Sequence, residues 1–212
     1  MRRSEFEVTD PQTIESVLSE CEYGVLSLMS RNEPYGVAVN FAYREGAVYF
    51  HGSIEGRKVE AIGEGSKVAF LVVKPYAYIP SYFSDTSAAY PATQFFTSVH
   101  INGEAIRVKD EREKAFGLSA LMEKMQPEGN YDPIDAANPI YTKMMELTGV
   151  YKIVPNVMTL KVKAGQNLPK ERYDTLIKHI EERNGSADGA TIQLMRIFQK
   201  QNDDGDGDFQ KS

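Results

Sequence analysis

The sequence predicts a mainly β protein of the α+β class: an antiparallel barrel of about six strands, closed or partly closed, with peripheral helices. Short segments of β-type pattern are separated by brief polar connections, and most of the helical spacing lies near the two ends of the chain. Closure is a common way for a sheet to avoid unpaired edge strands. The chain has 212 residues, of which 42% are hydrophobic, which is enough to bury a core.

The N-terminal part is predicted to hold one helix followed by three strands. Asp10-Pro11 is a helix start, because aspartate caps the first turn and proline is favoured at the first helical position. The β-type segments 24–30, 34–43 and 47–53 are joined by very short polar connections. Connections that short favour antiparallel neighbours, so these segments are predicted to form a meander.

The middle of the chain is predicted to form a short helix over 56–63 and an apolar strand over 67–74. Residues 75–93 hold three prolines and five aromatic side chains without periodicity, which predicts a long loop that is functional or contacts a partner. A long strand is expected over 94–109, with Gly103 as a bulge or bend. Asp110 is then expected to cap a helix.

The C-terminal part is predicted to be irregular over 127–147, to form a strand pair or one bent strand over 149–165, and to form helices over 170–183 and 190–200. The expected domains are a barrel domain over 1–165, a helical extension over 166–201 and a disordered acidic tail over 202–212.

Composition excludes several classes of protein. The net charge of −6 and the pI near 5.2 argue against a general binder of nucleic acid or of an anionic membrane. The single cysteine, Cys21, cannot form an internal disulfide, which fits a reducing compartment. No apolar run approaches the ~20 residues of a membrane span, and no signal peptide is visible. We therefore expect a cytoplasmic protein with no membrane partner.

Common catalytic and metal-binding motifs are absent from the sequence. There is no paired CxxC and no HExxH, so we expect no metal site. There is also no GxSxG elbow, no P-loop and no GxGxxG dinucleotide motif.

Three segments could instead converge on one ligand site. Segment 34–41 has small central side chains, which would let a flat ring approach the main chain, although an ordinary barrel strand has the same pattern. Segment 51–58 ends a strand at His51 and opens a short helix with Arg57 and Lys58, which could hold a phosphate. The alternative is an exposed histidine with two solvated cations. In the third segment, Thr97 or Ser98 could supply a hydroxyl group, unless both only lie on the outer face of a strand.

Four stretches together carry a resemblance to a known family. They are Pro-Tyr-Gly-Val-Ala-Val-Asn-Phe-Ala-Tyr at 34–43, Tyr-Phe-His-Gly-Ser at 49–53, Gly-Arg-Lys at 56–58 and Ser-Val-His-Ile-Asn-Gly-Glu-Ala at 98–105. Over residues 2–165 the chain resembles the Nim-type (5-nitroimidazole-resistance) branch of the pyridoxamine-5′-phosphate-oxidase-like FMN-binding split-barrel family. The resemblance implies a six-stranded split β-barrel that forms a homodimer, with FMN bound at the subunit interface.

The resemblance also implies roles for individual residues. The main chain from Val37 to Asn40 would line the isoalloxazine ring, His51 would lie beside it, and Arg57 with Lys58 would grip the phosphate. The cofactor-binding set implied or expected at this site is Val37, Ala38, Val39, Asn40, His51, Gly52, Ser53, Arg57, Lys58 and Ser98.

The function predicted from these observations is that of an FMN-dependent oxidoreductase, nitroreductase-like or related, acting on a small-molecule substrate. His51 is the expected catalytic residue, because a histidine protonated near neutral pH can donate a proton or stabilise negative charge. Aromatic residues of the 75–93 loop could form a substrate lid. Three alternatives stay open: a flavin-binding or storage protein without fast turnover, a haem-binding split barrel using His51 or His100, and a deazaflavin in place of FMN.

Overall fold

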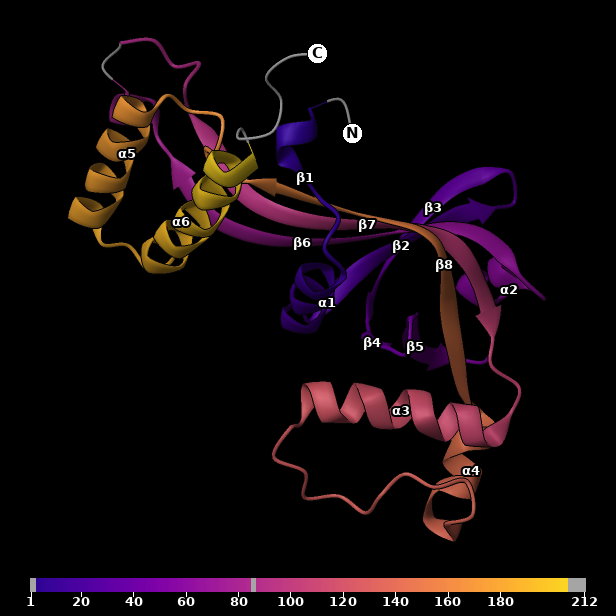
Figure 1. The fold of residues 1–212 in the computed structure, drawn as a ribbon. Coiled ribbons are helices and arrows are strands. Elements are labelled where there is room, and N and C mark those ends of the chain that lie inside the picture. The colour runs from indigo at the N-terminus through magenta and orange to yellow at the C-terminus, as the bar shows by residue number, and fades with distance from the viewer. Residues whose placement is uncertain (1–2, 85–86, 206–212) are drawn as a thin grey trace. The chain divides into compact units, whose positions relative to one another are not determined.

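The structure is a computed structural model and describes residues 3–84 and 87–205 (Figure 1). Within these residues the chain forms an antiparallel sheet with peripheral helices, which confirms the predicted fold class. The strands are β1 (Glu7–Val8), β2 (Tyr23–Ser30), β3 (Glu33–Asn40), β4 (Ala42–Arg44), β5 (Ala47–Ser53), β6 (Ser66–Ile79), β7 (Thr93–Arg107) and β8 (Thr148–Lys163). The helices are α1 (Pro11–Glu20), α2 (Arg57–Ile62), α3 (Glu111–Met125), α4 (Pro139–Leu147), α5 (Lys170–Arg183) and α6 (Asp188–Gly205), with short 3₁₀ turns at Ser4–Phe6 and Ser81–Phe83.

The described part of the sheet has eight strands, whereas the sequence pattern predicts about six. Their hydrogen-bonded order is β3-β2-β6-β7-β8-β5-β4, and β1 pairs with β8. The pairings β1–β8, β2–β3, β2–β6, β4–β5 and β5–β8 are all antiparallel. This order runs from β3 to β4 without closing, so the sheet is open in its hydrogen bonding and β3 is an edge strand.

The chain divides into two compact units. The sheet unit comprises residues 9–73 and 99–159, and the helical unit comprises the described residues of 1–8, 74–98 and 160–212. Strands β6, β7 and β8 run from one unit into the other. The domain boundaries expected at residues 165 and 201 stay predictions.

Local sequence signals place several elements where they were predicted. Asp10 caps α1 by accepting a 2.8 Å hydrogen bond from the Thr13 amide, and Pro11 holds the first helical position. Asp110 caps α3 in the same way by accepting a 2.8 Å bond from the Glu113 amide. Strand β5 and helix α5 have the predicted bounds.

The predicted strand over 34–43 is wrong in one respect, because it divides at Phe41. The Phe41 side chain is completely buried and packs edge-to-face on Phe70, with ring centroids 5.1 Å apart. Strands β3 and β4 on either side of it lie at opposite ends of the sheet order. The predicted meander therefore stops at this junction, since burial of one aromatic ring outweighs the continuous β pattern.

Two further predictions need correction, and one open alternative is decided. The 75–93 segment is not all loop, because β6 continues to Ile79. Near this end of the strand, the main-chain amide of Ala77 donates a 2.9 Å hydrogen bond to Thr191 Oγ1 on α6. The 127–147 segment is not all irregular, because Asn138 and Pro139 start α4. For residues 149–165 the sequence left a strand pair or one bent strand open, and the structure has one long strand, β8. Helix α6 runs to Gly205, and the rest of the predicted tail, 206–212, lies outside the described residues.

Each unit has its own buried apolar side chains. In the sheet unit the largest fully buried side chains include Phe41, Phe50, Phe70 and Tyr151, and in the helical unit they include Leu160, Ile180 and Met195. No helix in the described part of the chain is long and apolar enough to cross a membrane.

Candidate functional site

Strand β3 presents the predicted ring-lining segment at the edge of the sheet. Val39 is buried, Val37 is half-buried, and Ala38 and Asn40 are exposed, as strand alternation requires. The side-chain amide of Asn40 donates a 3.1 Å hydrogen bond through Nδ2 to the main-chain carbonyl of Glu22. Because β3 pairs only with β2 in the described sheet, its outer main-chain groups have no strand partner there.

The side of the sheet on which Ala38 and Asn40 lie also exposes large apolar residues. Ala38 is the register partner of Val25, and Val25 is in turn the partner of Leu71, so these three residues share one face. We call this surface the outer sheet face. Its exposed apolar residues on β2 and β6 are Tyr23, Val25, Met29, Leu71 and Val73, with exposures of 62%, 38%, 57%, 39% and 49%. A contiguous apolar surface of this kind is typical of a contact site.

The end of β5 brings His51, Gly52 and Ser53 to the start of a turn. His51 and Ser53 are exposed and Gly52 is half-buried. The Ser53 carbonyl accepts a 3.0 Å hydrogen bond from the Tyr151 hydroxyl, and the Ser53 hydroxyl accepts a 3.1 Å bond from the Glu55 amide. These two bonds hold the turn that leads into α2.

Lys58 lies directly against this strand end. A Cβ atom added to Gly52 would be only 2.5 Å from Lys58 Nζ, so the absence of a side chain at Gly52 makes room for the ammonium group. The same Nζ lies 5.4 Å from the ring centre of Phe50 and 5.6 Å from that of Tyr151. Partial burial lowers the pKa of Lys58, and no described carboxylate lies within ion-pair distance of it. The ammonium group of Lys58 is therefore held next to the main chain of Gly52, where no side chain intervenes.

Arg57 points toward different strands from Lys58. Its Nε donates a 3.1 Å hydrogen bond to Ser30 Oγ, its Nη2 lies 3.6 Å from Glu33 Oε2, and its guanidinium carbon is 4.5 Å from the ring centre of Tyr35. The predicted cation pair thus faces two ways: Arg57 already has a carboxylate partner on β3, whereas Lys58 contacts β5 and β8.

The surroundings of His51 favour the neutral form of its imidazole. Partial burial lowers its pKa below the ordinary value near 6.5, and the positive charge of Lys58 lowers it further. Without an anion at this site, the surroundings of His51 therefore disfavour the protonated form that the sequence predicts for catalysis.

Ser98 belongs to the other unit. It is half-buried on β7, in the segment of the strand that belongs to the helical unit. The neighbouring Thr97 is almost fully buried, and its hydroxyl has no hydrogen-bond partner among the described residues. Only the members of the predicted set that lie in the sheet unit can be described together.

Sequence reasoning missed the two rings beneath Lys58. Phe50 and Tyr151 stack at 5.3 Å with an interplanar angle of 17°, and they come from strands β5 and β8. Tyr151 lies far from Lys58 in the sequence, and only the antiparallel register of β5 with β8 brings them together. No local motif carries that signal.

Among the described residues there is no cluster of three or more histidine, cysteine, aspartate or glutamate side chains that could hold a metal ion.

Comparisons with known proteins agree with this architecture. The family described as pyridoxamine 5′-phosphate oxidase matches residues 10–162. No curated protein matches the chain. The fold is similar to that of the flavocytochrome Anf3 from Azotobacter vinelandii, with a TM-score of 0.64 and 24% identity over 80% of this chain and 75% of that chain.

Two further solved structures share the fold. An FAD- and haem-binding protein from Mycobacterium smegmatis has a TM-score of 0.63 and 17% identity over 75% of this chain and 74% of that chain. A candidate 5-nitroimidazole antibiotic resistance protein from Bacteroides thetaiotaomicron has a TM-score of 0.58 and 21% identity over 74% of this chain and 86% of that chain. The family match covers most of the chain and confirms the resemblance inferred from the sequence motifs. This chain belongs to the pyridoxamine 5′-phosphate oxidase family.

Proposed function

We propose that the protein is an FMN-binding flavoprotein that acts as an FMN-dependent oxidoreductase on a small molecule, in the manner of a nitroreductase. The observation that carries the proposal is the placement of Lys58: a half-buried ammonium group against Gly52, with no carboxylate partner among the described residues. A cation in such surroundings favours an anionic ligand, because the ligand supplies the charge that the protein does not.

The residues present fit a phosphorylated flat ring. Lys58 offers up to three N–H donors to a phosphate, and Arg57 could add two more if its contacts with Glu33 rearranged. The small exposed side chain of Ala38 lets a ring approach the edge of β3, where unpaired main-chain groups can bond ring heteroatoms. Val37, Val39 and Asn40 would line the same edge. The role of Ser98 as a polar contact stays a prediction.

Membership of the family supports a flavin, and so do the names of the similar structures. Anf3 is a flavocytochrome, and the Mycobacterium smegmatis protein binds FAD and haem. We favour FMN over FAD because the four sequence stretches resemble FMN-binding relatives and because one phosphate suffices for the cation at Lys58.

When bound, FMN would supply the electron transfer. The residues of this chain would bind and orient the cofactor and would supply a proton beside it. Lys58 would hold the phosphate through charge-assisted hydrogen bonds. His51 would lie beside the ring, where an added negative charge raises the pKa of the imidazole and makes it a proton donor. The apolar outer sheet face would exclude water from the ring.

We also propose a homodimer. The outer sheet face carries the exposed apolar side chains defined above, and a second copy would cover them. Leu71→Glu, which places a charge in this face, is expected to convert a dimer into a monomer at micromolar concentration in light scattering. Val157→Glu changes a residue on β8 that is 54% exposed, and it is the matched control that leaves the dimer intact. A wild-type monomer would refute the proposal.

Two alternatives need different measurements: the absorbance spectrum tests for haem, and turnover tests for storage. A haem protein is favoured by the haem-containing similar structures and by two accessible histidines, exposed His51 and half-buried His100. A flavin-storage protein would bind FMN without fast turnover. The absorbance spectrum of freshly purified protein distinguishes the visible bands of a flavin from the intense band of haem, and a deazaflavin absorbs differently from both.

The decisive experiment is therefore the spectrum, followed by mass spectrometry of the released cofactor and by turnover with a reduced nicotinamide donor and a nitroaromatic acceptor. The proposal expects a yellow protein that releases FMN and reduces the acceptor. Colourless protein that fails to bind added FMN in titration would overturn it, and bound FMN without turnover would leave the storage function.

A further inference from the structure

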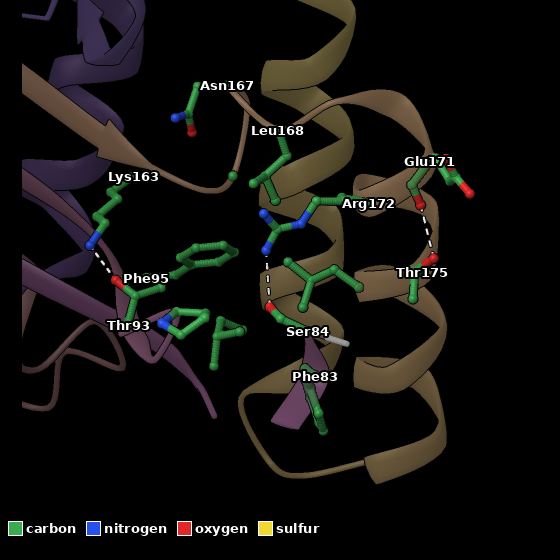
Figure 2. Close-up of a pocket in the computed structure, with 14 residues that line it drawn as sticks. Phe83, Ser84, Thr93, Phe95, Lys163, Asn167, Leu168, Glu171, Arg172 and Thr175 are labelled. Atoms are coloured by element: carbon green, nitrogen blue, oxygen red, sulfur yellow. Dashed lines mark hydrogen bonds between the residues drawn. The ribbon is translucent and has the colours of Figure 1, made fainter. Parts of the chain in front are cut away.

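The helical unit contains a pocket of its own, which the proposed flavin function does not use. Its volume is about 360 Å³, within the range of small-molecule sites. It is lined by the end of β6, the turn around Phe83, the first residues of β7, the end of β8 and the first turns of α5 (Figure 2). All of its lining residues belong to the helical unit.

The floor of the pocket is apolar and closely packed. Phe95, Ile79 and Leu176 line it and are almost completely buried, with exposures of 3%, 4% and 6%. The chain turns at Gly165 with φ of +75°, and a Cβ there would be 3.1 Å from both Phe95 and Leu168. The pocket is therefore bounded by packed side chains and a constrained turn, rather than by loosely placed surface residues.

Two cations reach this floor. Lys163 is half-buried and donates a hydrogen bond to the Thr93 hydroxyl, and Arg172 Nη2 donates a 3.0 Å bond to Ser84 Oγ. In Figure 2 the ring of Phe95 lies between the ends of these two side chains. Both of these bonds are made to neutral hydroxyl groups, and no described carboxylate is within ion-pair distance of either cation.

The environment of Lys163 also favours an anion. Partial burial lowers its pKa, and the charge of Lys161 lowers it further. A lysine held in this way is stabilised by any negative charge that enters the pocket. Glu171 is the lining carboxylate, and Figure 2 shows it on the side of the pocket away from Lys163. Two cations and one carboxylate leave one positive charge, which matches a monoanion better than a phosphate dianion.

We propose that this pocket is a second small-molecule site, which binds a monoanionic organic carboxylate with a flat apolar body. The carboxylate would bond to Arg172 and Lys163, and the apolar body would lie on Phe95 and Leu168. Arginine suits this role because its planar guanidinium group matches a carboxylate in a bidentate arrangement.

The test uses 2-naphthoate as the anionic probe and 2-naphthylmethanol as its neutral counterpart, in isothermal titration with the full-length protein saturated with FMN. We expect one equivalent of 2-naphthoate to bind, and the neutral counterpart to bind on the order of tenfold more weakly. Arg172→Gln and Lys163→Gln should each weaken binding of 2-naphthoate by about the same factor. Equal binding of both probes, or no saturable binding of 2-naphthoate, would overturn the proposal.

Arg196→Gln is the matched control, because Arg196 is an exposed cation of the helical unit that pairs with Glu181 at 3.0 Å. It should leave binding of 2-naphthoate unchanged. Circular dichroism of each variant checks that a loss of binding is not a loss of fold. Lys58→Ala separates the two sites: if it weakens 2-naphthoate binding while Arg172→Gln does not, the probe occupies the proposed flavin site and the inference fails. The result does not depend on whether FMN itself binds, since the titration can be repeated without it.

Discussion

The end of β5 with Lys58 and the pocket beside α5 each present a half-buried lysine without a described carboxylate partner, but they differ in shape. Lys58 lies against Gly52 at the end of β5 and over the two aromatic rings of Phe50 and Tyr151. Lys163 lies in a defined pocket, with Arg172 as a second cation. The first arrangement suits one charged end of a large flat ligand that a second protein surface covers. The second suits a small ligand that the unit encloses by itself.

The largest expected effect is a reciprocal loss of binding at the two sites. Lys58→Ala should weaken FMN binding by ten- to a hundredfold, roughly the worth of one charge-assisted hydrogen bond, and leave 2-naphthoate binding unchanged. Arg172→Gln should do the reverse. Isothermal titration of both ligands against both variants measures this.

A control within the sheet unit tests whether net charge alone explains the first effect. Lys109→Ala removes a cation that is 72% exposed and paired with Glu64 at 2.7 Å, and it should leave FMN affinity within about twofold of wild type. Equal weakening by Lys58→Ala and Lys109→Ala would show that the protein's overall field, rather than the contact at Lys58, attracts the phosphate.

A smaller effect is expected from Gly52→Ala. The added methyl group would lie 2.5 Å from Lys58 Nζ, so the ammonium group has to move away from the strand end, and FMN should bind several-fold more weakly. Stability should change by less than about 1 kcal/mol, because the end of a flexible side chain moves easily. Titration with FMN and urea unfolding of the same sample measure the two quantities.

Gly103→Ala provides the contrast for this prediction. Its methyl group would lie 2.3 Å from the carbonyl oxygen of Val154, which belongs to the main chain and cannot rotate away. We expect a loss of about 2–3 kcal/mol in the free energy of unfolding. If Gly52→Ala destabilised the protein as much as Gly103→Ala, Lys58 would be fixed in place rather than free to adjust to a ligand.

The smallest effect concerns the pKa of His51. In the folded protein it lies below the unfolded value near 6.5, so the unfolded chain binds more protons around that pH, and His51 lowers stability as the pH falls below 6.5. His51→Gln should therefore lose less stability than wild type on acidification from pH 7 to pH 5. Lys58→Ala should raise the pKa of His51 only part of the way, because burial is the larger cause.

Proton NMR titration of the His51 ring measures this pKa directly. Arg57→Ala is the control, since the guanidinium group of Arg57 contacts Glu33 and Tyr35 instead. A pKa of His51 that does not respond to Lys58→Ala would contradict the proximity of the two side chains.

Local chemistry explains why much of the fold was predictable. The carboxylates of Asp10 and Asp110 accept hydrogen bonds from main-chain amides only three residues further along the chain. Each helix start can therefore be predicted from neighbouring residues. For the candidate site, the sequence predicted which neighbouring residues take part but not the direction in which each side chain points. Arg57 and Lys58 are adjacent, yet residues one apart on a helix point about 100° apart, and the structure directs them to different strands.

The sequence by itself determined most helices and strands, the absence of common metal and nucleotide motifs, and the four stretches that identify the family. Tertiary structure alone decided that Phe41 breaks a continuous β pattern, that β3 lies at an edge, and that Tyr151 meets Lys58. It alone also brought Lys163, Phe95 and Arg172 to one pocket. The physical reason is distance along the chain: caps and periodicity act over a few residues, whereas strand order and side-chain burial depend on pairings between segments that no local pattern specifies.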